Sequence, residues 1–209
     1  MNSISDSDLP LVAFATLSFV CFCLTSIKNI QWVDGLYTLF QSVLTVCMCI
    51  YATQYDMDES IILKIALIYY VQRFFVEGRK VKKDMLIHHI VSLSASLYCL
   101  FTPILIPFVP YIFLIYSTSI FLNIKDVLYV QGMKESILYT VNGGFLWLSF
   151  IIFRIIMLPF IIYNICIVAP LIHCIIAILS LGLIWLLSVY WFSIITKRLF
   201  SRLLKKNKN

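Results

Sequence analysis

Charged residues are scarce in this sequence. Only 12% of its 209 residues are Asp, Glu, Lys or Arg, which is about half the share that is typical of soluble domains. Hydrophobic residues make up 62%, and the mean hydropathy is +0.97. This shortage of charge excludes an ordinary soluble domain. Because apolar stretches long enough to cross a bilayer recur along the whole chain, we expect an all-α fold, a polytopic membrane helix bundle.

The pattern of cysteines that a metal site or a disulfide framework needs is also lacking. All seven cysteines lie in or beside apolar stretches: Cys21, Cys23, Cys47, Cys49, Cys99, Cys166 and Cys174. The two Cys-x-Cys pairs would place their side chains on different faces of a helix, unlike the spacing of a zinc site. We therefore expect no metal site, and we interpret the cysteines as small buried apolar residues.

Apolar segments predict about seven transmembrane helices. They cover residues of about 10–27, 36–54, 60–77, 85–102, 108–124, 137–158 and 170–196. Pro159 and Pro170 mark the predicted connection between the last two segments, because proline punctuates regular structure. One bundle then accounts for the length of the sequence.

Basic residues alternate between the predicted loops. Four alternate regions contain Lys28; Arg79, Lys80, Lys82 and Lys83; Lys125 and Lys134; and Lys197, Arg198, Arg202, Lys205, Lys206 and Lys208. The opposite loops contain none, and one of them, "YDMDES", is acidic. Since loops rich in Lys and Arg stay in the cytosol, we predict an extracytosolic N-terminus and a cytosolic C-terminus. The net charge of +6 then indicates contact with anionic lipid and no nucleic-acid partner.

A few polar side chains fall within the predicted spans, where they are costly and tend to face the bundle interior. Our candidates for lining a cavity or binding lipid include Asn123, Asn142 and Arg154. Arg154 lies deep in "FLWLSFIIFRIIMLPF". It either reaches the outer interface or pairs with a carbonyl or carboxylate inside the bundle.

Two of the three histidines, His88 and His89, stand side by side in "GRKVKKDMLIHHIVSL". Neighbours on a helix point about 100° apart, so the pair is not the i, i+4 metal pair of a zinc protease. An inward neutral imidazole could accept a proton, act as a nucleophile or hold a ligand; structural hydrogen bonding is the alternative. Asp84, four residues before His88, either orients that imidazole or caps the helix.

Four segments resemble the TLC domain, the membrane family of translocating-chain-associating proteins, ceramide synthases and CLN-type neuronal proteins. "KKDMLIHHIVSL" resembles its histidine-pair helix, and "STSIFLNIKDVL" its Phe-Leu-Asn segment. "VNGGFLWLSFIIFRIIMLPF" resembles its helix with an embedded arginine, and "SVYWFSIITKRL" its terminal Tyr-Trp helix. The likeness is nearer to the small TLC-domain proteins than to the ceramide synthases.

The resemblance implies a six-helix core with one additional N-terminal helix. We therefore divide the chain into an N-terminal tail and first helix (1–30), a TLC-like membrane domain (31–200) and a basic cytosolic tail (201–209). It also implies residence in the endoplasmic reticulum or a related internal membrane. His88 and His89 match the pair that ceramide synthases use in acyl transfer. The His-Asp-x-x-Asp arrangement of those enzymes has no counterpart in "IFLIYSTSIFLNI".

The leading hypothesis is a protein of lipid handling or membrane lipid homeostasis. It would bind a membrane lipid or fatty acyl chain between its helices, with the histidine pair at the cytosolic mouth and without a cofactor. One alternative is a ceramide-synthase-like N-acyltransferase that uses acyl-CoA as co-substrate, with His88 or His89 as the catalytic residue; whether the chain is an enzyme stays open. Another is a non-enzymatic escort or insertion factor for membrane proteins. The sequence leaves the oligomeric state open.

Overall fold

The computed structural model describes residues 31–55, 58–77 and 83–206. The first predicted span, residues 10–27, lies outside the described residues. So do Lys28 and most of the basic run before Asp84.

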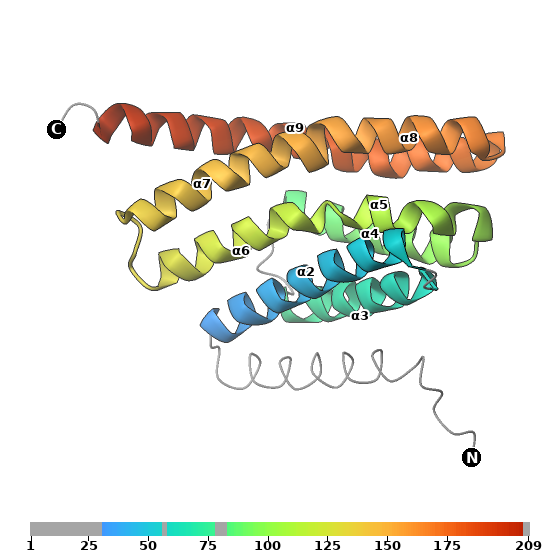
Figure 1. Ribbon diagram of the computed structural model, residues 1–209, viewed down its shortest axis with the longest axis horizontal. Coiled ribbons are helices and arrows are strands. Elements are labelled where there is room, and N and C mark those ends of the chain that lie inside the picture. Colours follow the sequence, from blue (N-terminus) through green and yellow to red (C-terminus); the bar gives the residue numbers. More distant parts are fainter. Residues whose placement is uncertain (1–30, 56–57, 78–82, 207–209) are drawn as a thin grey trace, which may run out of the picture.

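The described residues form helices that lie roughly along one axis (Figure 1). Three single helices come first: α2 (Gln31–Gln54), α3 (Ser60–Glu77) and α4 (Lys83–Leu100). Two composite rods follow, the first made of η2 (Pro103–Phe108), α5 (Val109–Phe113) and α6 (Tyr116–Val130), the second of α7 (Ile137–Ser149), η3 (Phe150–Ile156) and α8 (Met157–Val168). The last helix, α9 (Leu171–Lys206), has 36 residues. The expected all-α fold is confirmed for this part of the chain.

The structure supports part of the predicted set of membrane spans. Four described segments are long and apolar enough to cross a membrane: Gly35–Gln54, Pro103–Val130, Ile137–Val168 and Leu171–Ser201. The predicted span 60–77 coincides with α3, but α3 and α4 have 18 residues each and carry polar side chains such as Lys64 and the histidine pair. The count of seven spans is therefore not confirmed.

The helices close into a ring. Contacts run from α2 to α3, from α3 to α4, from α4 to α9, from α9 to the α7–η3–α8 rod, from that rod to α6, and from α6 back to α2. The short α5 contacts α2, α3 and α8. Fully buried side chains such as Leu63, Val109, Leu158 and Ile165 fill much of the interior. The ring therefore has an inside, and side chains that face it are shielded from lipid.

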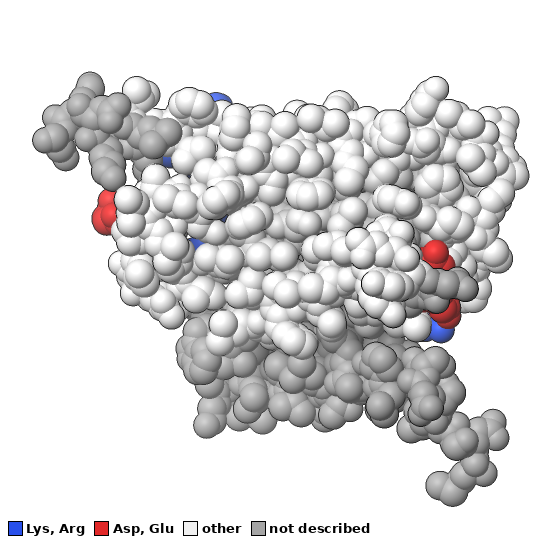
Figure 2. All heavy atoms as spheres, viewed as in Figure 1, with Lys and Arg blue, Asp and Glu red and all other residues white. Residues whose placement is uncertain are grey.

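Charged side chains gather toward the two ends of the bundle, and a broad uncharged belt lies between them (Figure 2). At one end lie Lys125, Lys134, Lys197 and Arg198, near the α6–α7 connection and the C-terminal part of α9 (Figure 1); we call it the basic end. At the other lie the α2–α3 connection, with Asp58 and Glu59, and the α8–α9 turn (Figure 1). We call it the hollow end, because the cavity described below lies in that half.

The prediction that Pro159 helps to separate the last two spans is wrong. The rod from Ile137 to Val168 passes through Pro159, and it contains a seven-residue π-helix, η3, just before it. Proline has no N–H for the carbonyl four residues earlier. The Trp185 indole of α9 donates to that carbonyl, the Ile155 oxygen, at 3.1 Å. A neighbouring helix thus supplies the hydrogen bond that proline removes, and the chain turns only at Pro170.

The interpretation of all cysteines as unpaired is also wrong. Cys166 in α8 and Cys174 in α9 form a disulfide across the turn at Pro170. Their separation of eight residues brings them together because the chain reverses between two packed helices. Cys47, Cys49 and Cys99 are free thiols, and Cys21 and Cys23 lie outside the described residues. Sequence spacing along separate helices could not reveal this pairing.

Candidate functional site: an apolar cavity and a buried polar centre

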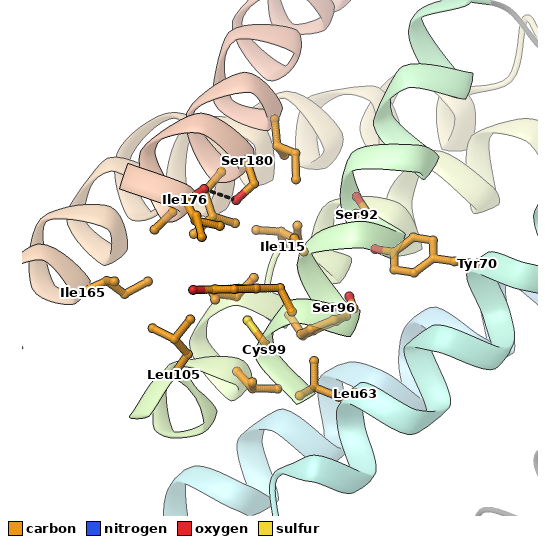
Figure 3. Close-up of a pocket in the computed structure, with 18 residues that line it drawn as sticks. Leu63, Tyr70, Ser92, Ser96, Cys99, Leu105, Ile115, Ile165, Ile176 and Ser180 are labelled. Atoms are coloured by element: carbon orange, nitrogen blue, oxygen red, sulfur yellow. Dashed lines mark hydrogen bonds between the residues drawn. The ribbon is translucent and has the colours of Figure 1, made fainter. Parts of the chain in front are cut away.

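An apolar cavity lies inside the ring toward the hollow end (Figure 3). Residues of α3, α4, η2, α5, α8 and α9 enclose it, among them Leu63, Ser96, Leu105, Phe113, Ile165 and Leu181. It contains about 650 Å³ of space between atoms, including the part that is open to the surroundings. The Ser180 hydroxyl donates to the Ile176 carbonyl of its own helix at 2.7 Å (Figure 3). That bond leaves the α9 wall without a free donor.

Helix α4 carries a buried polar stripe from the basic end into this cavity. His88, Ser92 and Ser96 repeat every four residues, and all three are buried. Residues spaced by four share one helix face, so the stripe is continuous. Ser92 and Ser96 line the cavity, and Tyr70 extends from α3 toward Ser92 (Figure 3). The stripe joins the histidine pair to the inner end of the cavity.

The two histidines contact different helices. The His88 ring meets the edge of Trp191 from α9, with ring centroids 5.4 Å apart. The His89 ring lies 6.1 Å from the Tyr70 ring of α3. Each residue is 8% exposed, so neither reaches lipid or water. Among the described residues, no group of three or more His, Cys, Asp and Glu side chains could hold a metal ion.

Asp84 binds α9. The Trp191 indole donates to the Asp84 carboxylate at 2.7 Å, and Trp191 in turn contacts His88. Asp84 lies in the first turn of α4, where a negative charge interacts favourably with the helix dipole. The carboxylate therefore touches the partner that holds the His88 ring in place.

Arg154 lies inside the bundle, which decides between the two placements that its sequence position allowed. It is 6% exposed, and its Nε donates to the Thr118 hydroxyl of α6 at 2.7 Å. The guanidinium also stacks over the Phe150 ring at 5.1 Å, a favourable cation–π geometry. The partners of Arg154 in the bundle are thus a hydroxyl and an aromatic ring, and neither is the carbonyl or carboxylate of the second alternative.

Tyr116, at the start of α6, is a site residue that the sequence analysis missed. It is 6% exposed, and its ring stacks on Phe113. Its hydroxyl lies beside the Tyr70 hydroxyl but has no hydrogen-bond partner of good geometry among the described residues. A tyrosine within an apolar segment gives no clear sequence signal here, because aromatic residues are common along the whole chain.

We call His88, Tyr116 and Arg154 the polar centre. Arg154 interacts electrostatically with both other members, and with Tyr70. Within the described residues, His88 Nδ1, the Tyr116 hydroxyl and Arg154 Nη1 are buried without hydrogen-bond partners. An unsatisfied buried polar group costs about 1–3 kcal/mol, and an arginine at mid-membrane about 2.5–3.5 kcal/mol. The polar centre therefore destabilises the folded protein unless a group from outside the described residues forms the missing hydrogen bonds.

Asn123 and Asn142 tie helices together at the basic end. Asn123 bonds to Thr38 and Ser42 of α2, each at 3.2 Å. Asn142 of α7 donates to the Phe121 carbonyl of α6 at 2.9 Å. Neither residue lines the cavity described above. Their amides connect neighbouring helices of the ring.

The fold and site define an α-helical membrane bundle with a polar, partly unsatisfied interior beside an apolar cavity. The TLC domain family matches residues 11–197, about nine-tenths of the sequence. The chain belongs to the TLC-domain family and is an integral membrane protein. Searches of curated proteins and of solved structures found no match.

Proposed function

We propose that this protein binds the acyl chain of a lipid inside its helix ring and thereby acts in membrane lipid homeostasis. The observation that carries this proposal is the apolar cavity that ends beside buried polar residues. Small-molecule sites combine an apolar pocket with a few polar groups that fix the orientation of the ligand. A lipid has the same division into an apolar chain and a polar end.

The position of the cavity favours a lipid over a water-soluble ligand. Large apolar side chains, including Phe160, Tyr163 and Leu179, are exposed on the outside of the described bundle, so lipid chains would contact this surface. The interior wall is almost entirely aliphatic and aromatic. A polar solute would lose its hydration there without compensating hydrogen bonds.

We further propose that the basic end faces the cytosol in the endoplasmic reticulum or a related membrane. The charge alternation supports this orientation. The disulfide Cys166–Cys174 lies at the opposite end, and disulfides persist in the oxidising environment of the lumen. The histidine pair would then lie between the cavity and the cytosolic surface.

A pair of matched substitutions on α4 tests the cavity as the binding site. Ala95 lines the cavity, so Ala95→Phe should fill it and reduce binding of tritiated palmitate to the purified protein by more than about tenfold. Ser94 is the neighbouring exposed residue, and Ser94→Phe should leave binding within about twofold. Unchanged palmitate binding by Ala95→Phe would refute the cavity as the site.

The buried imidazole of His88 supports acyl transfer as a second candidate function. Its Nδ1 has no partner among the described residues, and the polar stripe leads from it into the cavity. In this reaction the thioester C–S bond of acyl-CoA would break and an amide C–N bond would form with a lipid amine. The imidazole would accept the amine proton and pass it to the departing thiolate, which leaves as free coenzyme A. Mass spectrometry should then detect N-acyl lipid from acyl-CoA and a sphingoid base. Product formation that persists in both His88→Ala and His89→Ala would exclude the pair from catalysis.

A further inference from the structure

The polar centre brings together three buried polar atoms from three different elements. Arg154 Nη1 comes from η3, the Tyr116 hydroxyl from α6 and His88 Nδ1 from α4. Each of these residues is more than nine-tenths buried. The Nε of Arg154 already binds Thr118, and the guanidinium plane stacks on Phe150. Nη1 is thus a buried donor that is available to another partner.

The cavity reaches this centre through Tyr70. Tyr70 lines the cavity, its hydroxyl lies beside that of Tyr116, and it interacts electrostatically with Arg154. Ser92, on the stripe that begins at His88, lines the same inner end. His88, Tyr116 and Arg154 do not line the cavity themselves, so a chain that fills the cavity would reach their atoms with its polar end past Tyr70.

The chemistry of these atoms selects the charge of that polar end. Arg154 Nη1 and the Tyr116 hydroxyl are hydrogen-bond donors, and His88 Nδ1 donates in one of its tautomers. Within the described residues, no Asp or Glu contributes to the electrostatic environment of Arg154. A neutral head could accept hydrogen bonds but would leave the buried cation without a counter-charge. An anionic oxygen group satisfies the donors and balances the charge.

We propose that the ligand is an anionic amphiphile whose carboxylate or phosphate oxygens are bound by Arg154 and Tyr116, with His88 beside them, while its chain fills the cavity. This inference rests on the proposed function and adds the class of the ligand. A long-chain fatty acid and a single-chain phosphate monoester share this chemistry.

Binding of three 16-carbon probes to purified full-length protein tests the inference. The probes are palmitate, hexadecyl phosphate and uncharged hexadecanol. Arg154→Gln should weaken palmitate binding by about tenfold or more, because a charge-assisted hydrogen bond is lost, and should leave hexadecanol within about twofold. Tyr116→Phe should weaken palmitate by a few-fold. Arg154→Lys, which keeps the charge, should retain most of the affinity and serves as the folding control.

A surface substitution controls for net charge. Lys197 is exposed on α9, so Lys197→Gln removes one positive charge and should leave all three affinities unchanged. Weakening of hexadecyl phosphate by Arg154→Gln, with palmitate unaffected, would support the anion site and identify phosphate as its ligand. Unchanged binding of both charged probes would overturn the inference while Ala95→Phe still tests the cavity. Failure of every probe to bind the wild-type protein would overturn both proposals.

Discussion

The two ends of the bundle are built differently. At the basic end, side-chain hydrogen bonds link neighbouring helices: Tyr37 binds Gln72 at 2.6 Å, and Trp147 binds Thr196 at 3.0 Å. Asn123 and Asn142 add further links there. At the hollow end, the interior is an apolar cavity. There α8 and α9 are joined by a disulfide, and α4 and α9 by the hydrogen bond between Tyr98 and His173.

This difference separates two uses of polar residues within a membrane bundle. Asn123 forms hydrogen bonds to Thr38 and Ser42 of α2, so it links α6 to its neighbour in the ring. The polar centre (His88, Tyr116 and Arg154) lies between the two ends and contains buried atoms without hydrogen bonds. The free energy lost by burying these atoms has to be offset by a group other than the described side chains, such as a ligand. Removing residues of the two kinds should therefore have opposite effects on stability.

The largest effect is expected at Arg154. Arg154→Met replaces an uncompensated buried charge with an apolar chain of similar length, and exchanges of buried charge for apolar groups can stabilise by up to about 4 kcal/mol. The ligand-free protein should unfold at a higher temperature than wild type, while palmitate no longer raises that temperature. Thermal unfolding followed by circular dichroism measures both. A variant that is less stable than wild type without ligand would contradict a ligand-dependent polar centre.

At the hollow end, loss of the disulfide is the next largest change. Closing a loop of about eight residues stabilises by roughly 2–3 kcal/mol in the chain-entropy treatment. The double variant Cys166→Ser, Cys174→Ser should therefore be less stable by that amount, whereas Cys47→Ser, at an exposed free thiol, should not change stability. Rapid alkylation of Cys166 and Cys174 in the native, non-reduced protein would contradict the bond.

At the basic end, Asn123→Leu should destabilise by roughly 1 kcal/mol, because interhelical hydrogen bonds in membranes contribute about 0.6 kcal/mol each. Palmitate affinity should change less than twofold, since Asn123 does not line the cavity. Asn164→Leu is the matched control: Asn164 is bonded to the Phe160 carbonyl of its own helix, so no contact between helices is lost. Equal stability of the two variants would contradict the claim that Asn123 stabilises the bundle by joining two helices.

The smallest effect is expected at Asp58, outside the membrane helices. Its carboxylate accepts hydrogen bonds from the Ser60 hydroxyl and from the Ser60 N–H at the start of α3, at 2.8 and 2.9 Å. The Ser60 side chain lowers the pKa of Asp58 below its ordinary value. A lowered folded-state pKa gives stability that is present above the unfolded value and lost as the pH falls through the folded one. Asp58→Asn removes this titrating group, so the loss of folding stability toward low pH should be slightly smaller than in the wild type. An unchanged dependence of stability on pH would contradict the role of the hydrogen bonds between Asp58 and Ser60.

Composition and the length of the apolar segments predicted the helical membrane fold, because a segment that crosses a bilayer has to be both apolar and long enough. The boundaries of α3 and the placement of the histidine pair one turn into α4 also followed from the sequence. Pro159 misled the prediction because its cost inside a helix is offset by Trp185, a residue of another helix. The Cys166–Cys174 bond depends on how two helices pack, which spacing does not encode.

The candidate site was predictable only in part. His88 and Arg154 stand out because ionisable residues are rare in apolar segments. Tyr70, Tyr116 and Trp191 do not, since aromatic residues are common throughout such a chain. Their contribution arises when the ring of helices brings α3, α6 and α9 around α4. Asn123 and Asn142 stood out in the sequence for the same reason as Arg154, because each is a polar residue within a predicted span. Only their hydrogen-bond partners in the structure show that the two asparagines join helices, whereas Arg154 keeps an unsatisfied donor.

Covalent labelling by a fatty acid tests the central claim most directly. A palmitate analogue with a diazirine near the end of its chain would be bound to the wild-type protein, activated by light and located by peptide mass spectrometry. The account predicts label on residues of α4 and α9 that line the cavity, such as Ser96, Cys99, Ala177 and Leu181, and loss of that label with excess palmitate. Label found only on outward residues such as Phe101 and Leu171, which are 80% and 76% exposed, would contradict an acyl chain inside the ring.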